Sequence, residues 1–176
     1  SRSIPYFPAP GFWKRIKAAC EAHGTLLIFD EIPMGLGKTG RMFSCEHENV
    51  VPDIMVLGKS LGGGILPIAA VVCRPELDVC EDFAFGHYTH EKNPVTARAA
   101  LTTIQIIEDE GLVANAQLMG DLALERLHDM QQRFTEIGDV RGRGLLFGIE
   151  LVNDSESREA ANRLADKVLY ESLARG

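Results

Sequence analysis

Two charged side chains follow apolar runs that are typical of buried strands. Asp30 comes directly after the run at residues 25–29, and Lys59 comes shortly after the run at residues 54–57. Continuous β-branched, leucine and aromatic residues predict strands that are covered on both faces, as in a parallel sheet. Because open α/β sheets bind ligands at the carboxyl ends of their strands, we expect Asp30 and Lys59 to project from the same edge.

A lysine and a carboxylate at one sheet edge have complementary chemistry toward a pyridine ring. A lysine on the rim of a sheet is usually solvated, but the end of a buried strand removes part of its water, and desolvation favours the neutral amine that forms Schiff bases. A carboxylate beside the ring nitrogen keeps that nitrogen protonated, so that the ring accepts electrons. Asp30 and Lys59 therefore indicate pyridoxal phosphate, and Gly62, Gly63 and Gly64 would let it approach closely.

The glycine-rich segment GLGKTG at 35–40 offers a competing interpretation, because it matches the dinucleotide-binding pattern G-x-G-x-x-G. That pattern requires a helix that begins within the motif and meets the pyrophosphate, and residues 41–53 show no helical face. A P-loop would need a glycine at position 32, which is Ile32. We therefore interpret the segment as a loop that needs residues with positive φ.

Histidines and cysteines occur in two short clusters, CEH at 45–47 and HYTH at 87–90. Neither has the paired spacing of the usual zinc sites, so we predict no metal centre and interpret the histidines as surface or substrate-contacting residues. The four cysteines lie far apart without a C-x-x-C pair, which favours free thiols in a reducing compartment.

Composition narrows the classes of protein and partner. The 176 residues are 45% hydrophobic and 24% charged, which is typical of globular proteins and excludes disordered and fibrous classes. A net charge of −7 disfavours nucleic acid and anionic membranes, since those partners need a clustered basic surface. No apolar stretch approaches the roughly 18 residues of a spanning helix, and no signal-peptide pattern is present. We expect a small-molecule partner, no membrane association and a cytoplasmic location.

Amphipathic helices are expected around the strands, since apolar residues recur at helical spacing in four segments: 12–23, 94–110, 112–134 and 157–174. Asn93 is placed to cap the second of them, and Pro94 occupies its first position. A further strand, parallel or antiparallel, is expected at 65–73. The glycine-rich segment 140–152 predicts a strand pair or one strand with a bulge. The chain begins at Ser1 rather than at methionine, so we expect a segment of a longer protein.

Four blocks of the sequence resemble, in this order, the class III (ornithine and 4-aminobutyrate type) aminotransferases. They are LLIFDE, GLGKTGRMFSCEHENVVPDIMVLGKSLGGGILPIAAV, NPVTARAAL and DVRGRGLLFGIEL. The resemblance implies an α/β, fold-type-I enzyme that depends on pyridoxal phosphate and has a mostly parallel sheet. Residues 1–111 would form the second half of the large cofactor-binding domain, and residues 112–176 the beginning of the small C-terminal domain. The family's phosphate-binding loop would lie upstream of this chain and its substrate-binding arginine downstream.

The same resemblance assigns roles to individual residues. Asp30 would bind the pyridinium nitrogen of pyridoxal 5'-phosphate, and Lys59 would form the Schiff base and move a proton between the substrate's α-carbon and the cofactor. Ile32 occupies the position of an aliphatic side chain that packs on one ring face. Thr89 occupies that of a threonine that reaches the cofactor phosphate of the partner subunit. The resemblance thus implies a homodimer with the site at the interface, and a structural role for Glu31.

The expected activity is transfer of an amino group from an amine or amino acid to a keto acid. Two departures from the family pattern keep an alternative open: Pro33 stands where relatives commonly have a glutamine, and HYTHEK at 87–92 replaces a small, glycine-containing stretch. Pro33 offers no side-chain hydrogen bond, and His87, His90 and Lys92 would suit a phosphonate. The alternative is therefore an ammonia-lyase that acts on a hydroxy-amino phosphonate or amino alcohol. The second alternative is an inactive truncated module.

Overall fold

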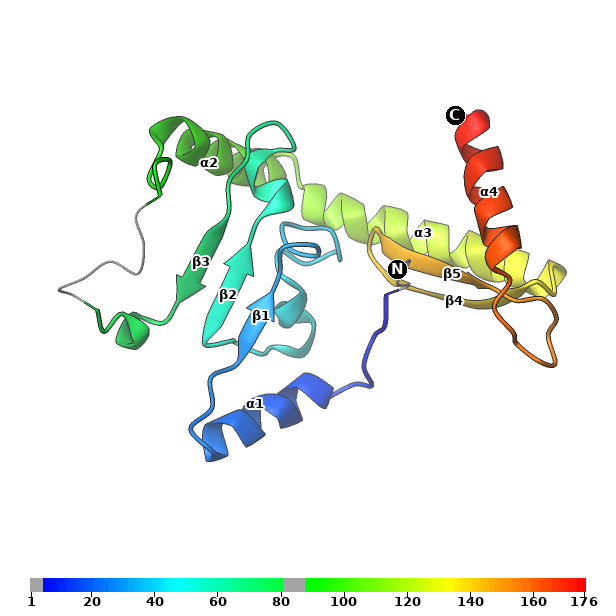
Figure 1. Ribbon diagram of the computed structural model, residues 1–176, viewed down its shortest axis with the longest axis horizontal. Coiled ribbons are helices and arrows are strands. Elements are labelled where there is room, and N and C mark those ends of the chain that lie inside the picture. Colours follow the sequence, from blue (N-terminus) through cyan, green and yellow to red (C-terminus); the bar gives the residue numbers. More distant parts are fainter. Residues whose placement is uncertain (1–4, 81–87) are drawn as a thin grey trace. The chain divides into compact units, whose positions relative to one another are not determined.

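The computed structural model of the protein describes residues 5–80 and 88–176 (Figure 1). The chain forms two compact units. The first unit comprises residues 8–116, and the second comprises residues 117–176 together with residues 5–7. The predicted division after Gly111 into large and small domains stays a prediction, and the two compact units separate five residues further along the chain.

A three-stranded sheet forms the centre of the first unit. Its strands are β1 (Ile28–Asp30), β2 (Ile54–Leu57) and β3 (Ala70–Cys73), in the order β1-β2-β3. β1 and β2 are parallel, with Asp30 opposite Val56, whereas β3 runs antiparallel to β2 (Figure 1). The two parallel strands therefore end at the same edge, as the sequence predicted.

Helices α1 (Phe12–Ala22) and α2 (Pro94–Asp109) belong to the first unit, as does the first turn of α3 (Leu112–Arg133). Asn93 caps α2 as predicted, since its side chain accepts a hydrogen bond from Val95 N at 2.9 Å and Pro94 fills the first helical position. In the described part of this unit, 3-10 helices at Ser44–Glu48, Lys59–Gly62 and Pro75–Leu77 connect these elements.

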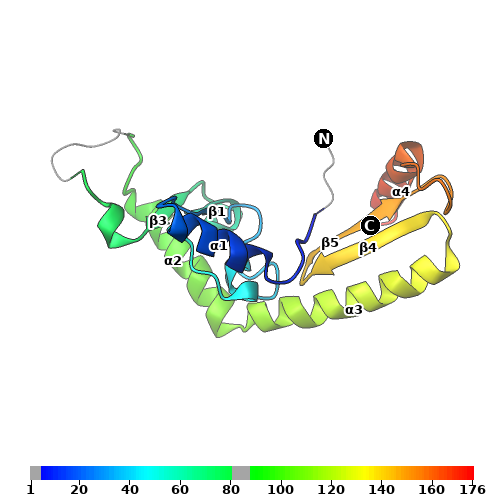
Figure 2. The ribbon, with the colours of Figure 1, turned by 90° about the horizontal axis from the view of Figure 1, so that it is seen from below.

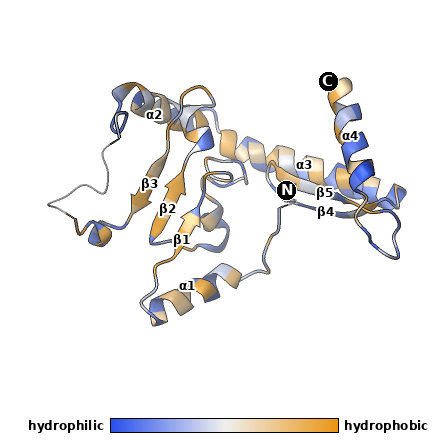
Figure 3. Ribbon diagram, in the orientation of Figure 1, coloured by the Kyte–Doolittle hydropathy of each residue, from blue (hydrophilic) through white to orange (hydrophobic). Residues whose placement is uncertain are grey.

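Two apolar clusters hold the first unit together. One contains Leu27, Phe29, Cys45 and Val50, against which α1 packs through Trp13; the Trp13 and Phe29 ring centroids are 4.9 Å apart. The other joins the end of β2 to α2 and consists of Leu36, Leu57, Leu61, Ala100 and Ile107. Figure 3 shows the hydrophobic residues concentrated along the strands. These clusters fix α1, α2 and the strand ends as one body.

β1 departs from its sequence prediction in length and in burial. It begins at Ile28, and its two faces differ, since Phe29 is buried while Ile28 is 56% exposed. Phe29 belongs to an apolar cluster that includes Trp13 of α1, Cys45 of the 3-10 helix Ser44–Glu48 and Met55 of β2, whereas Ile28 belongs to neither buried cluster. The expectation that this strand is covered on both faces is therefore wrong for the described part of the chain.

β3 is shorter than the predicted strand at 65–73. Ile65 N and Leu66 N both donate to Gly62 O, which keeps these residues in a turn, and Pro67 has no backbone donor for a ladder. Pairing therefore begins at Ala70, opposite Leu57.

The second unit contains an antiparallel hairpin packed along α3, followed by one helix. β4 (Ile137–Arg143) pairs with β5 (Leu146–Leu151), which confirms the prediction of a strand pair (Figure 2). α3 approaches the turn of this hairpin closely at Gly120, where any side chain would collide with the backbone of Gly144. Residues 5–7 also pack here, since Arg141 lies over the ring of Tyr6 with its Cζ 4.8 Å from the ring centroid.

The last helix, α4 (Asn162–Ala174), begins later than residue 157. The side chain of Asp154 accepts hydrogen bonds from the backbone amides of Glu156 and Ser157, and these residues form a turn instead of a helical first turn. Val168 and Leu169 of this helix are exposed. None of the helices in the described ranges combines the length and apolar character needed to cross a membrane.

Candidate active site at the ends of β1 and β2

The register of β1 and β2 places Asp30 and Lys59 at one edge of the sheet. Asp30 is the last residue of β1 and lies opposite Val56. β2 ends one residue later at Leu57, and Gly58 then leads directly into Lys59. The structure thus brings the predicted carboxylate and the predicted amine to neighbouring strand ends.

The Asp30 carboxylate is exposed and held by its own backbone. Its Oδ1 accepts a hydrogen bond from Ile32 N at 3.0 Å, closing a turn around Glu31. Glu31 N donates to Val56 O at 3.0 Å, so the pairing with β2 continues one residue past Asp30. The strand end is therefore fixed on both sides of the carboxylate.

Lys59 has an unusual backbone conformation. Its φ is 45°, in the left-handed region that non-glycine residues rarely adopt, and it opens the 3-10 helix Lys59–Gly62. The side chain is exposed, so the expected partial desolvation is not seen within the described residues. It lines an open hollow of about 560 Å³, together with Ser60, Gly63, Gly64, Thr103 and Ile107. The amine is thus accessible to a ligand.

Ile32 lies against the backbone that connects β2 to Lys59. A Cβ built on Gly58 would touch the Ile32 Cγ2 and Cγ1 atoms at 3.4 and 3.5 Å. The isoleucine side chain therefore lies within van der Waals reach of the chain next to the lysine. Asp30, Ile32 and Lys59 thus come together from two strands.

The glycine-rich segment at 35–40 is a largely buried loop. Gly35, Leu36, Gly37, Thr39 and Gly40 are all buried, and no helix begins among them, which agrees with the interpretation as a loop. The loop also contacts the residue that departs from the family pattern: Lys38 Nζ donates a hydrogen bond to Pro33 O at 2.8 Å.

Glu31 makes contacts that its sequence position did not predict. It is only 2% exposed, and its Oε1 accepts hydrogen bonds from Ser44 Oγ at 2.5 Å and from Cys45 N at 3.1 Å. The one sequence signal for Glu31 was an acidic residue at the end of an apolar strand, and nothing in the sequence pointed to Ser44 as its partner.

Cys45 is affected by this environment. Burial, and after it the negative charge of Glu31, raises the pKa of the Cys45 thiol to about 11.

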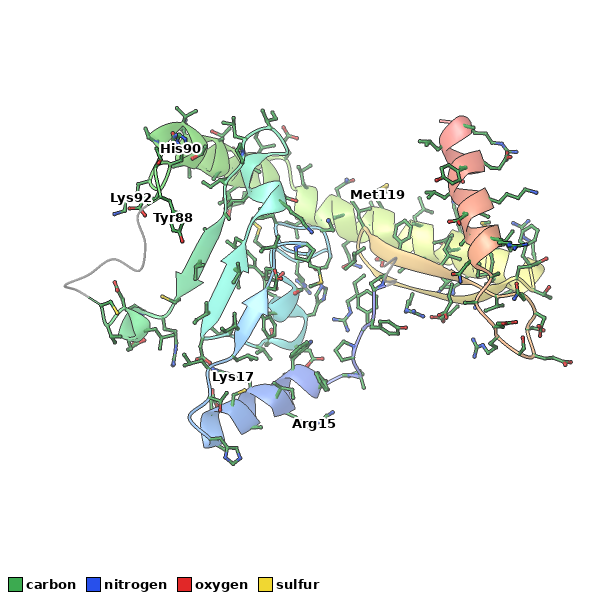
Figure 4. The ribbon with its side chains drawn as sticks, viewed as in Figure 1. Arg15, Lys17, Tyr88, His90, Lys92 and Met119 are labelled. Carbon is green, nitrogen blue, oxygen red and sulfur yellow. The ribbon has the colours of Figure 1, made fainter. Side chains whose placement is uncertain are left out.

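Thr89 lies apart from the contacts that join Asp30, Ile32 and Lys59. It is exposed in the turn that precedes α2, between Tyr88 and His90, with Lys92 following (Figure 4). Its role toward a partner subunit's cofactor stays a prediction, and His87 lies outside the described residues. No three histidine, cysteine or acidic side chains gather as metal ligands in the described ranges.

The family model for class III aminotransferases matches residues 5–174, which is nearly the whole chain. The chain belongs to the class III aminotransferase family. The predicted family assignment is therefore confirmed.

Two curated relatives of this class III chain are named for two different reactions, ammonia elimination and racemisation. The (R)-1-hydroxy-2-aminoethylphosphonate ammonia-lyase of Vibrio splendidus is 40% identical over 96% of this chain and 35% of its own length. The leucine/methionine racemase of Thermococcus litoralis is 44% identical over 96% of this chain and 38% of its own length. The chain thus spans little more than a third of the length of these relatives.

A solved structure also shares the fold. The amine transaminase of an uncultivated Pseudomonas species, crystallised in its PLP-bound form, matches 86% of this chain and 36% of its own, with 32% identity and a TM-score of 0.80. The predicted fold class is confirmed: the chain forms part of the mixed α/β fold of the fold-type-I pyridoxal-phosphate-dependent transaminases.

Proposed function

We propose that the protein is a pyridoxal-phosphate-dependent aminotransferase that moves an amino group from an amine or amino acid to a keto acid. The observation that carries the proposal is the arrival of Asp30, Ile32 and Lys59 at one sheet edge. The family match and the PLP-bound transaminase support the choice of cofactor.

The residues present fit this cofactor. Asp30 offers an exposed carboxylate whose orientation is set by the hydrogen bond from Ile32 N, and Lys59 offers an exposed amine at the rim of an open hollow. Ile32 adds an aliphatic surface beside both. When bound, pyridoxal phosphate would supply an electron sink for the charge that develops at the substrate's α-carbon.

Each side chain would then have a separate task. Lys59 Nζ would bind the cofactor's aldehyde covalently and, once released by the incoming amine, take the proton from the substrate's α-carbon. Asp30 would accept a hydrogen bond from the ring N–H and keep that proton in place. Ile32 would cover one ring face and exclude water from it.

Further parts of the proposal concern the whole subunit. We place the complete protein in the cytoplasm as a homodimer, with Thr89 reaching the site of the partner subunit. The exposed position of Thr89 in the turn before α2 leaves its hydroxyl free for such a contact.

The test uses the full-length subunit that contains this chain. Purified protein should show a visible absorption band of bound pyridoxal phosphate, and Lys59→Ala should remove it. Adding an amine donor to the wild-type protein should remove this band, and a keto acid added afterwards should restore it. An unchanged visible band in Lys59→Ala would contradict the proposal.

A second candidate function is ammonia elimination from a hydroxy-amino phosphonate or amino alcohol. It is favoured by Pro33 near the reacting face, by the basic side chains of His90 and Lys92 beside Thr89, and by the ammonia-lyase relative. Ammonia release without any keto acid would support it, since transamination needs an acceptor. Absence of release from every aminophosphonate and amino alcohol tested would count against it.

A further inference from the structure

Glu31 carries a buried carboxylate whose hydrogen bonds are incomplete. Its Oε1 accepts from Ser44 Oγ and Cys45 N, whereas its Oε2 is buried and has no hydrogen-bond partner among the described residues. Burying a carboxylate is costly unless hydrogen bonds compensate, and a buried polar atom left without a partner calls for an explanation. A hydrophobic residue would fill this position at lower cost if packing were its sole purpose.

The backbone around Glu31 is the structure that orients Asp30. The hydrogen bond from Ile32 N to Asp30 Oδ1 spans Glu31, so the backbone conformation of Glu31 determines where this donor meets the Asp30 carboxylate. Glu31 O accepts two further amides, from Met34 at 3.2 Å and from Gly35 at 2.8 Å. A displacement of Glu31 would therefore change the turn that holds Asp30.

The side chain of Glu31 ties this turn to a distant part of the same unit. Ser44 and Cys45 begin the 3-10 helix Ser44–Glu48, which packs into the cluster around Phe29. The fit is tight on the loop side as well, since a Cβ on Gly35 would lie 3.0 Å from Glu31 O and 3.2 Å from Glu31 Cβ. Glu31 is thus clamped through its backbone and its carboxylate together.

We propose that Glu31 is a positioning residue that fixes the Asp30 carboxylate against the cofactor ring, an inference that rests on the proposed function. Asp30 is exposed and makes its hydrogen bond within its own turn, so its direction depends on the rigidity of that turn. The clamp from Glu31 to Ser44 supplies the rigidity.

A double-mutant cycle on the full-length subunit separates this role from a general structural one. The dissociation constant of pyridoxal phosphate is measured for wild type, Glu31→Gln, Asp30→Asn and the double variant. If Glu31 acts through Asp30, we expect Glu31→Gln to weaken binding about five- to tenfold in wild type and less than about twofold in the Asp30→Asn background. Equal weakening in both backgrounds, or none, would overturn the inference.

Glu48 provides a matched control. Its carboxylate is also buried, at 8% exposure, and accepts a backbone hydrogen bond, from Trp13 N at 2.9 Å, but it lies at the other end of the same 3-10 helix. Glu48→Gln should affect cofactor binding equally in the wild-type and Asp30→Asn backgrounds. Coupling to Asp30 as strong as that of Glu31 would contradict a specific role for Glu31.

Ser44 keeps the inference testable if Glu31→Gln does not fold. Ser44→Ala should weaken cofactor binding in the same direction, and Ser44→Thr should restore it because the hydroxyl donor returns. Failure of the threonine to restore binding would count against the clamp. A wild-type subunit that binds no pyridoxal phosphate, or an Asp30→Asn variant that binds it normally, would refute the proposed function itself. Normal binding by Glu31→Gln together with weakened binding by Asp30→Asn would refute only the role of Glu31.

Discussion

Glu31 N donates a hydrogen bond to Val56 O at 3.0 Å, one residue past the last paired position of β1. Because of this bond, Asp30 lies inside the hydrogen-bonded ladder and not at a fraying strand end. Lys59 lies three residues after Val56, just beyond the end of β2. The carboxylate and the amine are therefore carried by two chain segments that are bonded to each other where they leave the sheet.

We expect Phe29→Ala to destabilise the first unit strongly. Phe29 is buried between the strand and α1, with its ring 4.9 Å from that of Trp13, and loss of a buried phenylalanine typically costs about 3–5 kcal/mol. Trp13 is the single tryptophan of the sequence, so its emission during urea unfolding reports the change. Lys14→Ala, at an exposed neighbour on α1, should leave the unfolding midpoint nearly unchanged. A midpoint for Phe29→Ala equal to that of wild type would show that this cluster does not stabilise the fold.

Asp53 should make stability depend on pH in the acid range. It is 3% exposed and accepts hydrogen bonds from Leu27 N at 2.7 Å and Lys17 Nζ at 2.8 Å, with Arg74 Nε at 3.1 Å (Lys17 is labelled in Figure 4). The hydrogen bond from Leu27, followed by that from Lys17, lowers the pKa of Asp53 below its ordinary value. The charged form therefore stabilises the fold above the unfolded-state pKa of about 3.9, and this contribution is lost as the pH falls through the lower folded-state pKa.

Thermal unfolding of wild type and Asp53→Asn across pH tests this. The difference between their melting temperatures should be largest near neutral pH and should shrink as the solution becomes more acid than about pH 4. Asp78→Asn changes an exposed carboxylate and serves as the control, for which we expect no such trend. A difference for Asp53→Asn that stays constant from pH 7 to acid would argue against the charge of Asp53 as the cause.

Gly120→Ala should destabilise the second unit although alanine is the better helix former. In an open helix position the change would stabilise by up to about 1 kcal/mol. Here a Cβ would collide with the backbone of Gly144, and forcing an extra methyl group into such a contact typically costs about 1–3 kcal/mol. The free energy of unfolding decides the sign, and a more stable Gly120→Ala variant would show that the hairpin turn does not lie against α3 in solution.

Cys45 should be the least reactive thiol of the first unit. It is buried and its pKa is raised to about 11, so only about 0.1% would be thiolate at pH 8. Alkylation of the native protein followed by peptide mapping should modify the exposed Cys73 and leave Cys45 intact until denaturant is added. Modification of both at the same rate in the native protein would contradict the burial of Cys45.

The sequence predicted the features of the site that depend on strand direction and chain order. Apolar runs followed by Asp30 and Lys59 were sufficient to place both at one edge, because parallel strands necessarily end on the same side. The cap at Asn93 could likewise be predicted, since its side chain accepts a hydrogen bond from an amide only two residues away.

Features that depend on contacts between distant residues could not be predicted from the sequence. The antiparallel direction of β3 follows from its pairing with β2, and apolar composition is the same for either direction. The clamp between Glu31 and Ser44 joins residues separated by 13 positions of irregular chain, which no spacing rule describes. The late start of α4 arose because the side chain of Asp154 competes for the amides of the first turn.

We propose that Lys59 is the residue that binds pyridoxal phosphate covalently. The most direct measurement is borohydride reduction of the full-length subunit with its cofactor, followed by digestion and mass spectrometry of the peptides. We predict that the reduced cofactor is found on the peptide that contains Lys59 and that Lys59→Arg abolishes this labelling. Labelling of a different lysine, or equal labelling of Lys59→Arg, would contradict this role of Lys59.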